Sequence, residues 1–338
     1  LLFTLHVSAQ PSFVIEKVAD GVYVSKRTET PGLIFDSNSV FIINDSDVFV
    51  VDTNFTLASA RANIAELKKL TNKPVRYIVN THWHDDHITG NAAWRDAYPD
   101  LKFIGHTSSR EDMKGVGAAN RDNLREHLGE TINLFKRALA DQKNIAGVPI
   151  TPDERASYLA DLSHLERYKD EGRYAEIIPP SVLVDDELSF TRGDRIITIR
   201  HLSRAHTGAD LIVQLPKENI VITGDLVVWP VPLVGSTSSP ASYASTLEKL
   251  LAIKPATFIP GHGPVMRDDS YVRSELALLQ SLVEQTRAAK ASGKSLDETR
   301  KVVKLDTFEK TFAGDSKSLA FVFANYVSGS GIAAAYNE

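Results

Sequence analysis

The sequence has no cysteine among its 338 residues. This absence excludes disulfide bonds and thiolate metal ligands, so any metal ion must be held by histidine, aspartate or glutamate. The chain also lacks runs of like charge, and its 38 basic and 43 acidic residues give a net charge of -5. We therefore expect no nucleic-acid partner, because such a partner requires a basic patch.

Long hydrophobic runs are missing too, although 43% of the residues are hydrophobic and a sizeable core can form. No stretch reaches the roughly 18 uninterrupted apolar residues of a membrane-spanning helix, so we expect no stable membrane insertion. The first residues, LLFTLHVSAQ, are mostly apolar and end in small residues. They predict that residues 1–9 are the remnant of a secretory signal peptide and that the protein is exported, in a bacterium to the periplasm. A first β-strand is the alternative interpretation.

Short apolar runs and amphipathic segments follow one another along the chain, which predicts an α/β protein. Val48–Val51 and Val75–Val79 are typical of buried strands, and Leu57–Leu70 between them has helical spacing. A similar order of strands and a helix returns between residues 181 and 259. We therefore expect two similar halves in one catalytic domain, residues 12–270, followed by a helical C-terminal extension, residues 271–338.

Residues 107–176 have a different pattern from the two halves around them. Residues 121–143 and 152–168 are long, charged and amphipathic, and prolines separate them. This predicts a helical hairpin inserted into the domain, which either borders the functional site or is only a packed addition. His127 and His164 lie in this hairpin, and we expect both on the helix surface rather than as ligands.

The densest group of potential metal ligands lies in the stretch VNTHWHDDHITG, residues 79–90. It contains His82, His84, Asp86 and His87 in the pattern H-x-H-x-D-H. Imidazole suits zinc and similar ions, and a neighbouring carboxylate adds charge for a second ion. The stretch follows a predicted strand and precedes a helix, and α/β proteins place their chemistry on such loops.

Three further candidate ligands also follow predicted strands. His206 lies in the loop AHTG, Asp225 follows a glycine, and His262 lies in the turn PGHGP. A catalytic ion needs about three protein ligands and an open position. We therefore expect two metal sites bridged by Asp225, with His82, His84 and His206 on one ion and Asp86, His87 and His262 on the other.

The four segments THWHDDH, AHTGAD, TGDLV and PGHGP together resemble the metallo-β-lactamase superfamily of hydrolases. The match in order runs over residues 38–267, apart from the insertion. The resemblance implies a four-layer αβ/βα sandwich, two zinc ions per chain, a shallow groove at one edge and the ligand assignment above. β-Lactamases with a cysteine ligand have that cysteine where this chain has Asp225. An aspartate there resembles glyoxalase II and the acyl-homoserine-lactone lactonases.

These features predict a dinuclear zinc hydrolase with a small-molecule substrate. Zinc lowers the pKa of bound water from 15.7 to roughly 7, so a metal-bridging hydroxide is available to attack a carbonyl carbon. Asp86 is placed to orient that water. We expect a carboxyl ester, lactone or thioester as the substrate, with a β-lactam amide as the alternative. The fold also supports phosphodiesterase or nuclease activity and di-iron redox chemistry, but the charge disfavours the first and no flavin domain is visible for the second.

Substrate contacts are expected from three aromatic residues: Trp83, Trp229 and Tyr243. Trp83 and Trp229 lie in ligand loops, where aromatic side chains suit the side of a groove but equally suit a packed core. Tyr243 lies on a predicted helix and is a candidate donor to an oxyanion, although its position favours a role in the core. Asp52 follows the strand Val48–Val51. It either orients a metal ligand from behind or caps its own loop, and the sequence leaves both interpretations open.

Overall fold

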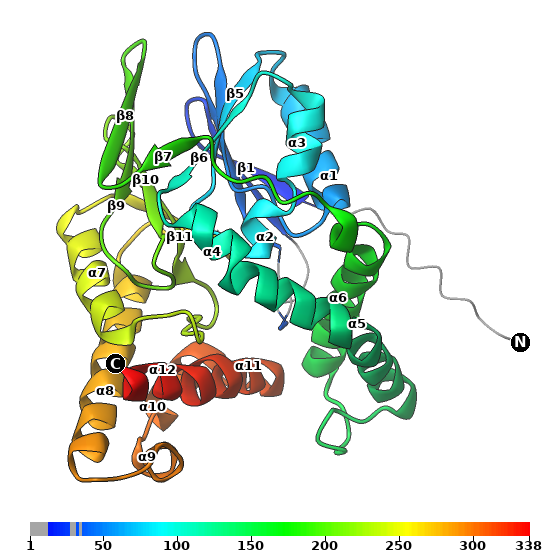
Figure 1. The fold of residues 1–338 in the computed structure, drawn as a ribbon, viewed down its shortest axis with the longest axis vertical. Coiled ribbons are helices and arrows are strands. Elements are labelled where there is room, and N and C mark those ends of the chain that lie inside the picture. The colour runs from blue at the N-terminus through cyan, green and yellow to red at the C-terminus, as the bar shows by residue number, and fades with distance from the viewer. Residues whose placement is uncertain (1–12, 28–31, 34–35) are drawn as a thin grey trace, which may run out of the picture.

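Two β-sheets lie face to face at the centre of the computed structural model, with helices outside them (Figure 1). The structure describes residues 13–27, 32–33 and 36–338. The predicted signal-peptide remnant, residues 1–9, lies outside this range.

The first sheet has seven strands, and their order in space is their order in the chain. The strands β1 to β4 pair antiparallel, whereas β4 to β7 pair parallel. The seven strands are β1 (Phe13–Ala19), β2 (Val22–Arg27), β3 (Ser39–Ile43), β4 (Val48–Val51), β5 (Val75–Val79), β6 (Lys102–His106) and β7 (Val182–Val184).

The second sheet has five strands in the order β12-β11-β10-β9-β8. Only β11 and β12 pair parallel, and the other pairs are antiparallel. The five strands are β8 (Glu187–Arg192), β9 (Arg195–His201), β10 (Leu211–Leu215), β11 (Ile220–Val228) and β12 (Thr257–His262).

The layers follow from which side chains each strand buries. Alternate residues point to opposite faces of a strand, so Val51 packs between the sheets whereas Val50 packs under α1 (Leu57–Leu70) and α3 (Asn91–Ala97). On the other side, α7 (Pro240–Ala252) and α8 (Ser270–Ala291) cover the second sheet through Leu247 and Leu279. The predicted α/β fold, a four-layer αβ/βα sandwich, is thereby confirmed.

The predicted insertion is present as α4 (Ser109–Lys114), α5 (Val116–Asp141) and α6 (Pro152–Asp170), with α5 and α6 forming the hairpin. Thr151 and Glu154 cap the start of α6 in a capping box, which fixes where the second helix begins. His127 is exposed as expected. The surface prediction for His164 is wrong: its side chain is 1% exposed because α6 packs against the domain, beside Asp36.

The extension after α8 is helical, as predicted. It contains α9 (Leu296–Val302), α10 (Asp306–Ala313), α11 (Lys317–Phe323), a π-helical turn η2 (Ala324–Gly331) and α12 (Ile332–Asn337). The stretch Lys317–Asn337 is the one helix among the described residues that matches a membrane span in length and composition. In this fold its residues Phe323, Val327 and Ile332 are buried against Leu282 of α8.

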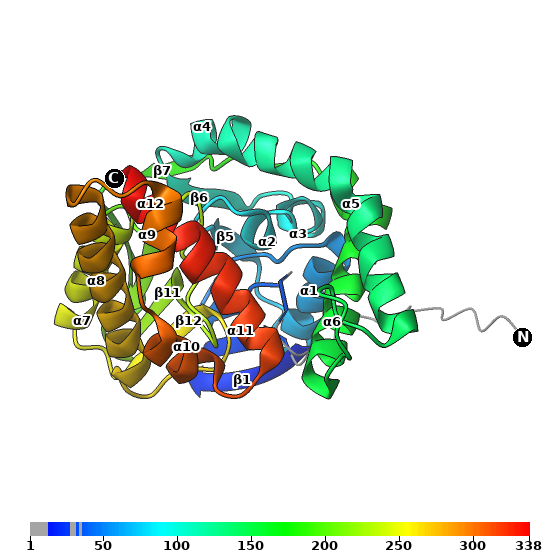
Figure 2. The same cartoon turned by 90° about the horizontal axis from the view of Figure 1, so that it is seen from below.

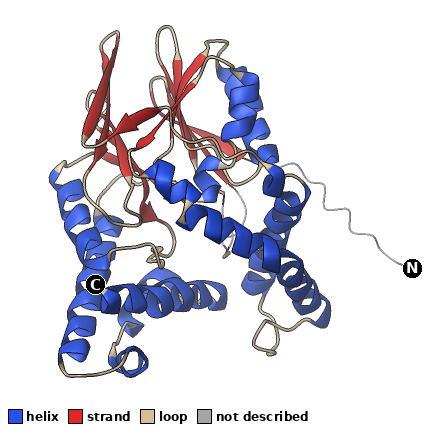
Figure 3. Cartoon of the chain, in the orientation of Figure 1, coloured by secondary structure: helices blue, strands red, loops and turns tan. Residues whose placement is uncertain are grey.

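The insertion and the extension lie on the same side of the sandwich, below the sheets in the view of Figure 3. Figure 2 shows one end of α11 beside α6 and α12 beside α9. Asp153 in the first turn of α6 joins the two regions, since its carboxylate accepts hydrogen bonds from the Ser316 hydroxyl (2.7 Å) and the Ser318 amide (3.3 Å) at the start of α11.

Candidate metal centre

The predicted ligands come from both sheets and meet between them. The loop after β5 carries His82 and His84 and continues into α2 (Asp85–Ile88), which carries Asp86 and His87. The second sheet contributes His206 from the β9–β10 loop, Asp225 from β11 and His262 from β12.

Two of these positions differ in detail from the prediction. Asp225 lies within β11 rather than after its end, and His262 is the last residue of β12. Gly224 has a φ of +52° and breaks the register between β11 and β12, so the strand continues past it with Asp225 turned toward the other sheet. Gly261 makes room for that carboxylate, because a Cβ there would lie 2.0 Å from Oδ1 of Asp225.

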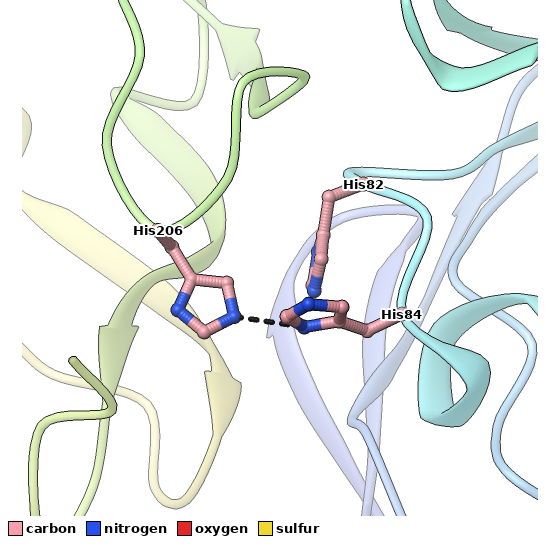
Figure 4. Close-up of side chains that lie close together, drawn as sticks. All are labelled: His82, His84 and His206. Atoms are coloured by element: carbon pink, nitrogen blue, oxygen red, sulfur yellow. Dashed lines mark hydrogen bonds between the residues drawn. The ribbon is translucent and has the colours of Figure 1, made fainter. Parts of the chain in front are cut away.

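The first ligand cluster contains His82, His84 and His206. One ring nitrogen of each lies within 4.8 Å of those of the other two. Nε2 of His206 is 3.0 Å from Nδ1 of His84, and Figure 4 shows the three rings converging from opposite sides of the site. Three converging imidazoles are a typical ligand set for one zinc ion.

The second cluster contains Asp86, His87, Asp225 and His262, again with ligand atoms within 4.8 Å of one another. Nε2 of His262 is 3.1 Å from Oδ2 of Asp86 and 3.3 Å from Oδ1 of Asp225. Nε2 of His87 is 3.2 Å from the same oxygens. This cluster therefore surrounds one small volume with two imidazoles and two carboxylates.

The carboxylate of Asp225 faces both clusters at once. Its Oδ1 lies among the second cluster, and its Oδ2 is 3.6 Å from Nε2 of His206 and 4.0 Å from Nε2 of His82. The structure thus places Asp225 where the sequence expected a bridging ligand.

The outward nitrogens of these histidines are fixed by the protein. Nδ1 of His206 donates to the Leu233 carbonyl (2.9 Å), and Nδ1 of His262 donates to the Asp36 carbonyl (3.0 Å). Hydrogen bonds of this kind set the ring orientation and leave the other nitrogen as a lone-pair donor toward the centre.

Asp52 performs the same role for His87. Its Oδ2 is 2.7 Å from Nδ1 of His87, and the carboxylate also accepts from the amide and hydroxyl of Thr81, each at 2.8 Å. The orienting interpretation of Asp52 therefore agrees with the structure.

The two clusters differ in charge. Burial lowers the pKa of His84 to about 3 and holds that of His82 well below its usual range, so both rings are neutral donors at pH 7. In the second cluster, burial disfavours the protonated form of His262. The carboxylates of Asp225 and Asp86 outweigh this effect of burial and raise the pKa of His262 to about 9. The carboxylates of the second cluster therefore favour positive charge at this place, which a bound cation would supply instead of a ring proton.

The donors fit a pair of metal ions. Nε2 of His82, Nε2 of His87 and Oδ1 of Asp225 are buried and make no hydrogen bond to the described part of the chain. Buried polar atoms without a partner are costly and rare. Bound cations at the two clusters would satisfy all three atoms, and a set of nitrogen and carboxylate ligands suits zinc.

A cavity of about 320 Å³ opens over the two clusters. His84, His206, Asp86 and Asp225 form its floor. The residues around the floor come from the insertion, the extension, the segment between β2 and β3 and the loops before α1 and α7: Leu33, Phe55, Asn120, Leu124, Leu233, Gly235, Ser236, Thr237, Tyr326 and Ser330.

The three aromatic residues expected to contact substrate do not line this cavity. Trp83 is buried against Met113 in a small apolar cluster, and Trp229 is 40% exposed but lies elsewhere, beside Gly263. The prediction for Tyr243 is wrong, because its side chain is fully buried and its hydroxyl donates to the Asp225 carbonyl (2.7 Å).

The residues of α5 and η2 that surround the cavity were not predicted from the sequence. Asn120 and Leu124 lie on α5, and Tyr326 and Ser330 lie in η2, far along the chain from the ligand loops. Helical spacing was the only signal at Leu124, and it is equally typical of a packed helix face.

A buried acid behind the centre leads to a testable pH effect. The hydroxyl of Tyr243 lies 3.2 Å from the carboxyl of Glu275, which is fully buried, and burial raises the pKa of Glu275 well above its ordinary 4.5. The folded protein therefore keeps this proton as pH rises above 4.5 while the unfolded chain loses it. Stability from this group falls by about 1.4 kcal/mol per pH unit until the raised pKa is reached.

Replacing Glu275 by glutamine should remove this loss of stability with rising pH. We expect Glu275→Gln to raise the melting temperature relative to the unmodified protein, by more at pH 8 than at pH 5. The exposed Glu284→Gln on the same helix is the matched control. An equal shift at both pH values would contradict a protonated Glu275.

The sequence matches the family model described as "Metallo-beta-lactamase superfamily" over residues 33–262, more than half of the chain. A curated relative is a "Linear primary-alkylsulfatase" from Pseudomonas sp. (strain ATCC 19151), 24% identical over 271 residues. The alignment covers 76% of this chain and 48% of the relative, so the chain spans about half the length of that protein.

Solved structures show the same fold at low identity. The sec-alkylsulfatase Pisa1 from Pseudomonas sp. has a TM-score of 0.61 at 16% identity, covering 94% of this chain and 50% of that one. The DIM-1 metallo-β-lactamase has a TM-score of 0.53 at 17% identity, covering 80% of this chain and 98% of that one. For the metallo-β-lactamase IND-7 the TM-score is 0.54 at 18% identity, with 80% and 98% covered.

Proposed function

The chain belongs to the metallo-β-lactamase superfamily of hydrolases, and from this membership we propose that it binds two zinc ions and cleaves a carboxyl ester, lactone or thioester. One observation supports this proposal above the others: the Asp225 carboxylate faces both ligand clusters, as a ligand shared by two ions would. A pair of ions suits hydrolysis, since one ion can stabilise the attacking oxygen and the other ion the leaving group.

The ligands divide between the two ions. His82, His84 and His206 would hold one ion, Asp86, His87 and His262 the other, and Asp225 both. When bound, the ions supply a water of lowered pKa and a Lewis acid for the carbonyl oxygen.

The chain's own side chains do the remaining work. Asp86 is partly exposed to the cavity, so its carboxylate can accept a hydrogen bond from the attacking water and orient it. Asn120 and Thr237 line the same cavity and offer donors to a carbonyl or leaving oxygen. Overall, an acyl C–O or C–S bond is replaced by an acyl C–O bond to water, and the leaving group takes up a proton.

Sulfate-ester hydrolysis is the second candidate, because two relatives are named as alkylsulfatases. The fold likeness to β-lactamases keeps a β-lactam amide as a further alternative.

A substrate panel tests the proposal. Zinc-loaded protein is assayed with an aryl ester, a homoserine lactone, a glutathione thioester, dodecyl sulfate and nitrocefin, and its metal content is measured. We expect about two zinc ions per chain, from the two ligand clusters, and turnover of one or more carbonyl compounds above that of the sulfate and the β-lactam. Sulfate release alone would select the second candidate, and iron in place of zinc would overturn the zinc assignment.

A further inference from the structure

The cavity over the ligands is mostly apolar on the sides that lie away from the metal floor. Leu33, Phe55, Leu124 and Leu233 form these sides together with the ring of Tyr326. Apolar sides in a concave site bind apolar parts of a ligand, and the few polar groups orient it. The polar groups of the cavity away from the floor are amide and hydroxyl side chains, such as Asn120 and Ser330.

Two parts of the chain outside the shared sandwich contribute to these sides. The insertion contributes Leu124, and the π-helical turn η2 of the extension contributes Tyr326 and Ser330. The turn η2 lies beyond residue 262, where the match to the family ends. π-Helical turns are rare and often occur at functional sites, which singles out this turn in an otherwise α-helical extension.

Direct contacts fix these parts around the cavity. The backbone of Leu33 is held from both directions, since its amide donates to Asp161 of α6 (3.0 Å) and its carbonyl accepts from the Tyr326 hydroxyl (3.2 Å). With the Asp153 hydrogen bonds to the start of α11, these contacts join insertion, extension and Leu33 into one pocket.

The charge of the pocket limits what the apolar region accepts. Among the described residues that line it, none is lysine or arginine, and the charged side chains are those of the metal floor. A carboxylate or sulfate on the far end of a substrate would lose its hydration there without gaining a cation. An uncharged aliphatic tail loses little hydration free energy when it enters the apolar region of the cavity.

We propose that the pocket formed by Leu33, Phe55, Leu124, Leu233 and η2 binds the uncharged aliphatic chain of a carbonyl ester or lactone, with the carbonyl at the metal floor. This inference rests on the proposed function and names its substrate class. Water adds to the carbonyl carbon, the acyl C–O bond breaks, one proton passes to the leaving alcohol oxygen, and the acid product ionises. No oxidant or further reactant is required.

Chain length and charge in the substrate test the pocket. We expect kcat/KM of zinc-loaded protein for p-nitrophenyl butyrate to exceed that for the acetate by about tenfold, the effect of burying two further methylene groups. The mono-p-nitrophenyl ester of succinic acid, similar in length but negatively charged at its end, should be hydrolysed about tenfold more slowly than the butyrate.

Two variants from different regions alter the pocket. Ser330→Leu fills it from η2, and Leu124→Gln makes its insertion side polar. Each should lower kcat/KM for the butyrate by roughly tenfold while changing the acetate little. The matched controls are Ser328→Leu in the same turn, which does not line the cavity, and Leu134→Gln, an exposed position on the same helix α5. Unchanged melting temperatures of the variants show that they fold.

A binding measurement separates the pocket from the reaction. The uncharged ketone methyl hexyl ketone should raise the melting temperature of the unmodified protein and of both controls, but not of Ser330→Leu or Leu124→Gln. Binding without ester hydrolysis would support the pocket and overturn the proposed function. Hydrolysis with no dependence on chain length and no ketone binding would overturn the pocket while the function stands. Equal turnover of the succinate ester and the butyrate would also overturn the proposed binding of an uncharged chain in the pocket.

Discussion

Replacing Asp225 by asparagine should lower kcat for the best substrate by roughly a thousandfold, because this carboxylate would hold both proposed ions, each of which would stabilise the transition state by several kcal/mol. The carboxylate reaches both clusters, with Oδ1 3.2 Å from Nε2 of His87 and Oδ2 3.6 Å from Nε2 of His206. An amide keeps the shape of the side chain but loses its charge, so the protein should retain its fold and bind fewer than two ions.

Metal content and kcat, measured on the same desalted sample, check this prediction. Glu275→Gln is the matched control, since it replaces a buried acid by its amide at a position that is no candidate metal ligand and is held protonated, so that no charge is lost there. Removing metal from the unmodified protein with a chelator should abolish turnover, and added zinc should restore it. A variant Asp225→Asn with two ions and full activity would exclude the bridged centre.

Replacing Asp52 by asparagine should weaken metal binding at the second cluster, and with it activity, by roughly 10- to 100-fold. Asp52 is no ligand itself, but its carboxylate lies 2.7 Å from Nδ1 of His87 and stabilises the ring orientation that aims Nε2 at the centre. Asparagine tolerates the left-handed backbone of this position, whose φ is 60°, so the substitution changes charge with little backbone strain.

The measurement is competition for zinc against a chromophoric chelator, together with kcat. The control is Asp45→Asn, an exposed position in the turn between β3 and β4. We expect one of the two binding constants, that of the second cluster, to change in Asp52→Asn and neither to change in Asp45→Asn. Two unchanged constants would show that Asp52 only caps its loop.

The candidate ligands were predictable because they lie in short sequence segments whose residue types alone indicate metal binding. His82, His84, Asp86 and His87 lie within six residues. His206 lies in the loop between β9 and β10 and His262 ends β12, where α/β folds gather functional groups. The continuation of β11 through Gly224 was not predictable, since a glycine beside an aspartate usually signals a turn. Only the partner strand β12 shows that Gly224 instead bends a strand.

The surroundings of the ligands were harder to predict because they depend on packing between distant segments. Trp83 lies between two ligands in the chain and Tyr243 lies on the helix between Asp225 and His262, yet large aromatic side chains are readily buried, and both pack in apolar clusters. His164 lies on a charged helix that reads as exposed, but α6 turns it toward Asp36. Tyr326 has no motif around it, and it reaches the cavity only because α11 packs on α6.

The separation between the floor of the cavity and its sides has a consequence for how such a protein can diversify. The candidate metal ligands lie on strands, loops and the short helix α2 of the sandwich, between residues 82 and 262, whereas Leu124 and η2 belong to the insertion and the extension. Substitutions in these two added regions can change which molecules enter without disturbing the groups that react with them. A lineage can therefore acquire new substrates through the insertion and the extension while its chemistry is inherited unchanged.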